Sequence, residues 1–202
     1  MSDYDMKKDS EEKGKMAVKI LDALVFDKLS IDYEVRTEVS RYGTKPFYFT
    51  FVVDVDVDKM YMESLKYDST YSSVMYDLEN HIERALRYVN LQDYFGGVFY
   101  YYFNDSLLES EVNKMEDKLF PTIKQKYPEV TKEEFKQSEI YFYPYKSESD
   151  YASIRIDFVG LDIRDENDDV LVDCDTIFDI MYEIFLASPL SNSFEYENAI
   201  CL

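Results

Sequence analysis

An alternation of apolar and acidic residues constrains the fold of this chain more than any other feature. The segment FYFTFVVDVDVD, residues 47–58, has an apolar residue at every odd position and ends with an aspartate at every second position. Because successive side chains of a strand point to opposite faces, this pattern predicts a strand with one buried face and one face bearing Asp54, Asp56 and Asp58. Residues 31–39 show the same period of two, and the turn RYGTKP joins the two segments. The sequence therefore predicts a long β-hairpin.

Apolar residues three and four positions apart predict helices on both sides of this hairpin. The predicted helices lie at about residues 10–28, 74–89, 106–119 and 176–187, and the capping box Thr131-x-x-Glu134 opens a further helical turn. Pro121 is expected to kink or end the third of these helices.

Three further strands are predicted, at residues 98–103, 139–145 and 152–164. The first, VFYYYF, is apolar or aromatic on both faces, which is typical of a central strand or of one covered by a partner. In the last, the apolar phase slips at Val159–Gly160, which predicts a bulge.

The order of these elements predicts an α+β fold, with antiparallel sheets built from long β-hairpins and flanked by helices. The segment VVDVDV (52–57) can be laid on FVGLDI (158–163), which indicates two αββα-type halves. We expect a first domain over residues 1–104 and a second over residues 105–202, with a single merged domain as the alternative.

The net charge limits the classes of partner. Forty-two acidic residues against 22 basic ones give a formal net charge of −20. Nucleic acids and anionic membranes are bound through basic patches, so neither is an expected partner, whereas a basic protein remains possible. The charged N-terminus and the absence of a long apolar run predict a soluble protein that no signal peptide exports.

The strand aspartates raise the question of a metal site. On the same predicted face, the neighbouring strand bears Asp32, Glu34 and Glu38, with Arg36 as the nearby cation. Several carboxylate oxygens can bind Mg²⁺ or Ca²⁺. However, the glycine-containing loop that precedes such aspartates in nucleotidyl-transfer enzymes is replaced by aromatic residues. The favoured interpretation is a solvated sheet face or an interface for a basic partner.

A second acidic segment partly matches a calcium-binding loop. Four residues fall on the first, third, fifth and ninth ligand positions of such a loop: Asp165, Asn167, Asp169 and Asp173. The sixth position is Val170 where glycine is needed, and the twelfth is Thr176 where a bidentate glutamate is needed. We therefore expect a solvated loop, with Asp173 or Asp175 as the N-cap of the last helix.

No set of residues indicates an enzyme. His81 is the single histidine, so one chain cannot form a multi-histidine metal site, and neither Cys174 nor Cys201 has a histidine or a basic cluster nearby in sequence. Gly96–Gly97 cannot alone form a phosphate-binding loop. The sequence predicts no catalytic, cofactor-binding or metal-binding residue. Both cysteines are expected to be reduced thiols.

Aromatic residues favour a role in protein–protein contact. The chain has 20 tyrosines and 14 phenylalanines, with tyrosines at 100–102 and at 141, 143 and 145. Stacking of single-stranded bases also needs a positive groove, which the charge of this chain disfavours. Aromatic side chains are enriched in protein interfaces, and we expect that use here.

The order helix, two long strands, helix, strand over about residues 10–103, repeated over 106–187, resembles the neck and tail-completion proteins of tailed bacteriophages. These are small α+β subunits that assemble into rings between portal and tail. The resemblance implies a structural head–tail connector protein, oligomeric, in the virion or the host cytoplasm. Two alternatives are an acidic inhibitor or nucleic-acid mimic that binds a basic protein, and a carboxylate-dependent metal-binding protein.

Overall fold

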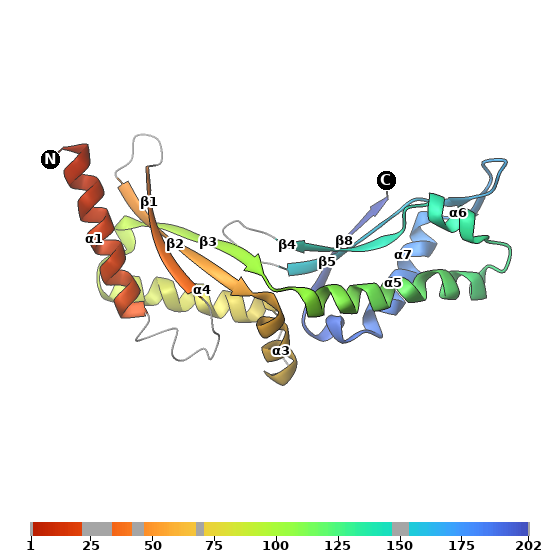
Figure 1. Cartoon of the computed structure of the whole chain (residues 1–202), viewed down its shortest axis with the longest axis horizontal. Coiled ribbons are helices and arrows are strands. Elements are labelled where there is room, and N and C mark those ends of the chain that lie inside the picture. Colours follow the sequence, from red (N-terminus) through yellow and green to blue (C-terminus); the bar gives the residue numbers. More distant parts are fainter. Residues whose placement is uncertain (1, 22–33, 42–46, 68–70, 147–153, 202) are drawn as a thin grey trace. The chain divides into compact units, whose positions relative to one another are not determined.

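The computed structural model describes residues 2–21, 34–41, 47–67, 71–146 and 154–201 (Figure 1). The chain divides into two compact units. Unit 1 contains the residues up to Asp105, and unit 2 begins at Ser106.

Unit 1 is a three-stranded sheet with helices. Its elements are α1 (Asp3–Leu21), β1 (Glu34–Arg41), β2 (Phe47–Asp56), α3 (Val57–Tyr67), α4 (Tyr71–Tyr88), the 3₁₀ turn Gln92–Tyr94 and β3 (Phe95–Phe103). The strand order is β1-β2-β3, in which β1 pairs antiparallel with β2, from Arg41 opposite Phe47 to Glu34 opposite Asp54. This confirms the predicted antiparallel pairing of the two segments, whereas residues 42–46 of the predicted turn lie outside the described residues. The third strand, β3, pairs parallel with β2.

Unit 2 has a second three-stranded sheet and a small hairpin. Its elements are α5 (Ser106–Lys126), α6 (Lys132–Gln137), β4 (Tyr141–Lys146), β5 (Ile154–Gly160), β6 (Ile163–Arg164), β7 (Val170–Val172), α7 (Cys174–Leu186), the 3₁₀ turn Pro189–Asn192 and β8 (Glu195–Cys201). The strand order is β4-β5-β8, antiparallel between β4 and β5 and parallel between β5 and β8. Strands β6 and β7 pair separately.

The two three-stranded sheets share one topology. In each, a helix precedes an antiparallel hairpin, a second helix follows, and the last strand returns parallel to the middle strand. The register of the parallel pair shifts at the same place, between Phe49 and Phe51 in β2 and between Ile156 and Phe158 in β5. Phe51 therefore corresponds to Phe158, one residue away from the superposition expected from sequence.

The α+β class is confirmed, but the prediction of antiparallel sheets is wrong. Each three-stranded sheet is mixed, because its last strand is parallel to the middle one. A parallel connection needs a crossover, and α4 and α7 belong to these crossovers. Each unit is therefore αββαβ in outline. The last strand of unit 1 was predicted at residues 98–103, whereas that of unit 2, β8, is one strand more than the predicted second half.

Helices cover one face of each sheet (Figure 1). In unit 1, α1 packs on β1 and β2, and the α4 residue Glu79 accepts a 2.8 Å hydrogen bond from the buried Tyr100 hydroxyl of β3. In unit 2, α5 packs on β4 and α7 packs on β5. Phe158 of β5 is fully buried there, with its ring centroid 5.3 Å from that of Phe142 and 6.0 Å from that of Phe185.

The first and third helices extend beyond their predicted ends. Helix α1 begins at Asp3, where Ser2 and Asp5 exchange hydrogen bonds, so the chain is capped well before residue 10. The predicted part beyond residue 21 lies outside the described residues. Helix α5 continues through Pro121 to Lys126, because buried Leu119 and Ile123 prolong its apolar stripe on both sides of the proline.

Several strands differ from the prediction. Strand β2 ends at Asp56, where α3 begins. Strand β3 is an edge strand of its sheet, so the interpretation of VFYYYF as a central strand is wrong, while its cover by a partner stays a prediction. Strand β5 ends at Gly160, so the phase slip marks a strand end in place of the predicted bulge. Strand β8 was not predicted, since its partner β5 lies far away in sequence. Among the described helices, none has the length and apolarity to cross a membrane.

Candidate protein–protein interface

The face of the unit 1 sheet opposite α1 and α4 carries a row of exposed aromatic side chains. Along β3, buried Val98 and Tyr100 alternate with Phe99, Tyr101 and Phe103, which are 37%, 49% and 49% exposed. Alternation places these three side chains on the face opposite the core. We call this row, on its edge strand, aromatic face 1. The tyrosine run 100–102 is therefore split between the two faces of the sheet, because Tyr100 belongs to the core and Tyr101 belongs to aromatic face 1.

The unit 2 sheet has a corresponding aromatic face 2. On β4, buried Phe142 alternates with Tyr141 and Tyr143, which are 39% and 49% exposed. Tyr145 follows on the same side, with the guanidinium carbon of Arg155 4.2 Å from its ring centroid. The predicted tyrosine row at 141, 143 and 145 therefore lies on one side of an edge strand.

The three strand aspartates do not form one carboxylate cluster. Asp54 Oδ1 accepts a 2.6 Å hydrogen bond from Arg36. Asp56 is buried, accepts hydrogen bonds of 3.1 and 3.2 Å from the Asn104 amide, and caps α3 through the Lys59 N–H at 3.0 Å. Asp58 lies in the first turn of α3, so the prediction of three aspartates on one strand face is wrong for this residue.

The interpretation of these strand carboxylates as a site for Mg²⁺ or Ca²⁺ gains no support. Asp32 and the side chain of Glu34 lie outside the described part of the chain, whereas Glu38 is exposed on β1. Within the described part, no strand aspartate joins a group of three side chains that could hold a metal ion.

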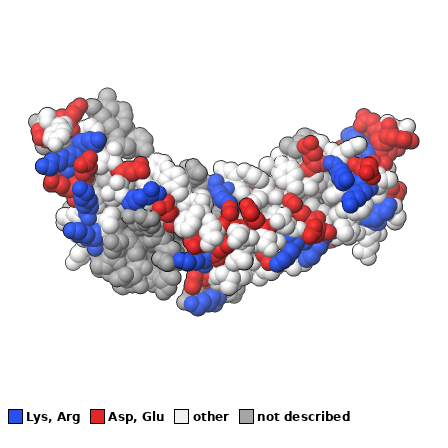
Figure 2. Space-filling model, in the orientation of Figure 1, with Lys and Arg blue, Asp and Glu red and all other residues white. Residues whose placement is uncertain are grey.

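The calcium-like segment forms the β6–β7 turn and the start of α7. Asp165 Oδ1 accepts hydrogen bonds from the N–H groups of Asn167 (2.8 Å) and Asp169 (2.9 Å), so its carboxylate closes the turn. These backbone hydrogen bonds lower the pKa of Asp165. Acidic side chains gather at this turn in Figure 2, while acidic and basic groups are interspersed over much of the rest of the face shown.

Asp173 is the N-cap of α7, as predicted. Its carboxylate accepts the Thr176 N–H at 2.8 Å, and this hydrogen bond lowers the pKa of Asp173 below its ordinary value of 3.8. A carboxyl group whose pKa is lowered by folding stabilises the folded state at pH values above its ordinary pKa. This stabilisation is lost as the pH falls through the lowered pKa.

We therefore expect Asp173→Ala to lower the Tm at pH 7 by ~2–4 °C, with the difference from wild type shrinking as the pH falls below the ordinary carboxyl pKa of 3.8. Thermal melts at pH 7 and at acidic pH test this, with Asp175→Ala as the control in the same turn. An undiminished difference at the acidic pH would contradict the capping role.

The remaining residues singled out in the sequence have structural positions. His81 is exposed on α4. Gly96 lies where a Cβ atom would come within 3.2 Å of Tyr48 and 3.3 Å of Thr50, and Gly97 has a φ of 126°. These glycines allow the register shift at the start of β3, which accounts for them without a bound phosphate.

Comparisons of the chain with models of protein families, with curated proteins and with solved structures found no match. The two aromatic faces are therefore the basis for assigning a function.

Proposed function

We propose that this protein is a non-enzymatic assembly subunit whose copies pack against one another through aromatic faces 1 and 2. The observation that carries the proposal is the row of exposed aromatic side chains on an edge strand of each three-stranded sheet, β3 in unit 1 and β4 in unit 2. Tyrosine and phenylalanine contribute a large contact area at a small cost in side-chain entropy, which favours them in interfaces.

The charges around these faces fit contact between copies of an acidic chain. On the side of the unit 1 sheet that bears aromatic face 1, Asp54 is paired with Arg36, and Asp56 accepts hydrogen bonds from Asn104. In unit 2, Asp157 is buried and Arg155 Nε lies 3.1 Å from its carboxylate. Asp54, Asp56 and Asp157, which lie beside the aromatic rows, are therefore engaged within the chain.

A hydrogen bond at the edge of β4 favours contact between copies through the face of the sheet over the addition of a strand to its edge. A Glu116 carboxylate oxygen of α5 accepts the Phe142 N–H at 3.3 Å, which occupies a backbone donor that a neighbouring strand would need. Burial raises the pKa of Glu116. An added strand would have to displace this carboxylate, so contact through the tyrosine side chains is the simpler arrangement.

Each chain offers one aromatic face in each unit. If face 1 of one copy contacts face 2 of the next, the contact is heterologous, and a heterologous contact builds a ring when its rotation closes. A ring agrees with the resemblance to the neck proteins of tailed bacteriophages, so we propose a head–tail connector of a virion as the specific role. This step from a ring to a virion connector depends on the order of helices and strands along the chain.

The acidic-mimic alternative has less support. It requires free rows of carboxylates as substitutes for phosphates, whereas Asp54 and Asp56 are engaged by Arg36 and Asn104. The two proposals also differ in their response to salt. Salt screens repulsion between acidic copies and should strengthen self-assembly, whereas it weakens binding to a basic partner.

Light scattering after size-exclusion chromatography tests the proposal. We expect the mass to rise above the 24.0 kDa of one chain as the protein concentration increases, and to rise further with added salt. A mass of 24.0 kDa at every concentration and salt level would contradict self-assembly. Salt-sensitive capture of a basic protein by such a monomer would favour the alternative.

A further inference from the structure

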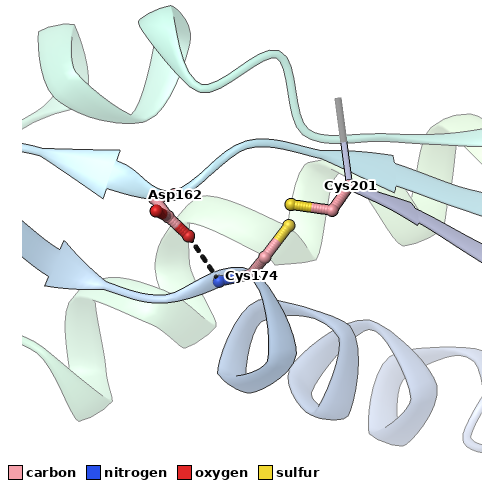
Figure 3. Close-up of side chains that lie close together, drawn as sticks. All are labelled: Asp162, Cys174 and Cys201. Atoms are coloured by element: carbon pink, nitrogen blue, oxygen red, sulfur yellow. Dashed lines mark hydrogen bonds between the residues drawn. The ribbon is translucent and has the colours of Figure 1, made fainter.

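Two cysteines lie next to each other in unit 2, although they are far apart in sequence. Cys174 is the first residue of α7 and Cys201 is the last of β8. Their sulfur atoms lie within 4.8 Å of each other (Figure 3). Gly160 contacts both cysteines. It pairs with Cys201 in the parallel β5–β8 pair, and its carbonyl accepts a 3.4 Å hydrogen bond from Cys174 Sγ.

We propose that Cys174 and Cys201 form a reversible dithiol–disulfide pair that fastens strand β8 to the start of helix α7 when a small-molecule disulfide is the oxidant. The inference is independent of the assembly function. It concerns only contacts within unit 2.

The reaction proceeds by two thiol–disulfide exchanges. The Cys201 thiolate attacks one sulfur of the oxidant RSSR, which forms a mixed disulfide and releases RS⁻. The Cys174 thiol then gives up its proton and attacks the Cys201 sulfur, which forms the Cys174–Cys201 bond and releases a second RS⁻. Two protein thiols are oxidised, and one RSSR is reduced to two RSH after protonation.

The surroundings of the two thiols set this order. Cys201 is exposed and lines a cavity of about 360 Å³, so a small disulfide can reach it. Cys174 is buried, and burial, followed by the neighbouring Cys201 and Asp162, raises its pKa to about 12. Cys174 therefore reacts slowly with reagents in solution but lies close to a mixed disulfide formed on Cys201.

The cavity also indicates which oxidant reacts faster. Its acidic lining residues are Glu134, Asp162, Asp165 and Asp168, against one cation, Arg164. Cystamine, a disulfide with two ammonium groups, should therefore oxidise the pair faster than the anionic glutathione disulfide.

A metal site is the competing use of these residues, because Asp162 completes a group of three potential ligands with the two sulfurs. However, both carboxylate oxygens of Asp162 are engaged. Oδ1 accepts the Cys174 N–H at 2.9 Å and Oδ2 accepts Arg164 Nη2 at 2.8 Å. The guanidinium beside this carboxylate opposes a second cation, so the geometry favours sulfur–sulfur bonding.

Mass spectrometry of the full chain after exposure to cystamine or glutathione disulfide tests the proposal. We expect the wild type to lose two hydrogen atoms and both thiols, with cystamine acting several-fold faster, and dithiothreitol to restore both thiols. The oxidised protein should melt roughly 5–10 °C higher. A wild-type product that stays as a mixed disulfide on Cys201, or that forms dimers through Cys201, would overturn the proposal.

Two serine variants and one metal separate the remaining outcomes. Cys174→Ser should accumulate the mixed disulfide on Cys201, whereas Cys201→Ser should leave Cys174 unreacted in the folded protein. If Cys174 in the Cys201→Ser variant reacts as fast as Cys201 in the Cys174→Ser variant, the assigned order of the two exchanges is wrong. Reduced wild type should retain no stoichiometric Zn²⁺ after gel filtration. Retention of one Zn²⁺ per chain that Cys174→Ser and Asp162→Asn both abolish would replace the disulfide with a metal site.

Discussion

Replacement of Phe158 by alanine is expected to lower the free energy of unfolding of unit 2 by about 3–5 kcal/mol. Phe158 lies on the middle strand β5, is fully buried, and stacks on Tyr196 of β8 with 4.2 Å between ring centroids. Its ring also packs edge-on against those of Phe142 and Phe185. The substitution therefore leaves a cavity where the sheet meets α7. Urea unfolding and hydrogen exchange of unit 2 amides measure the loss.

Two matched variants make this result specific. Phe51→Ala, at the corresponding position of β2, should cost a similar amount in unit 1, because Phe51 is also fully buried. Phe103→Ala removes the same atoms from an exposed position on β3 and should cost less than ~1 kcal/mol. Equal losses for Phe158→Ala and Phe103→Ala would contradict the assignment of core and face.

Glutamate at the centre of each aromatic face should break the assembly. Tyr101→Glu and Tyr143→Glu each replace a half-exposed ring with a charge on an already acidic chain. Loss of a central aromatic side chain in an interface typically costs about 2 kcal/mol, so each variant should weaken association roughly 30-fold. Light scattering across a concentration series measures the change.

Tyr88→Glu is the matched control for these variants. Tyr88 is 86% exposed at the end of α4 and lies on neither aromatic face, and the substitution changes the net charge equally. We expect it to leave association within a few-fold of wild type. If Tyr88→Glu weakens association as much as Tyr101→Glu, net charge and not the aromatic faces controls assembly.

The sequence predicts the parts of this fold that depend on local periodicity or local hydrogen bonds. Helix α4 follows from its apolar stripe, the β1–β2 hairpin follows from two alternating segments, and Asp173 is readable as an N-cap. Each depends on residues close together in the chain. The exposed side of β4 is also predictable, because its tyrosines alternate with apolar residues.

The parts that depend on distant residues were not predictable. The parallel pairing of β8 with β5 joins segments on either side of α7, and only the folded chain brings Cys201 next to Cys174. Asp56 looked like part of an exposed acidic row, but Asn104 binds it from a distant position and the helix α3 starts beside it. The apolar faces of VFYYYF indicated a central strand or one covered by a partner, and because β3 is an edge strand, only the second interpretation stays a prediction.

Hydroxyl-radical footprinting of the protein at low and at high concentration tests most directly whether the aromatic faces are the contact surfaces. Tyr101 and Tyr143 should become protected as the mass rises, while Tyr76 and Tyr88, both exposed on α4, should stay reactive. Assembled protein in which Tyr101 and Tyr143 remain as reactive as in the monomer would contradict the assignment.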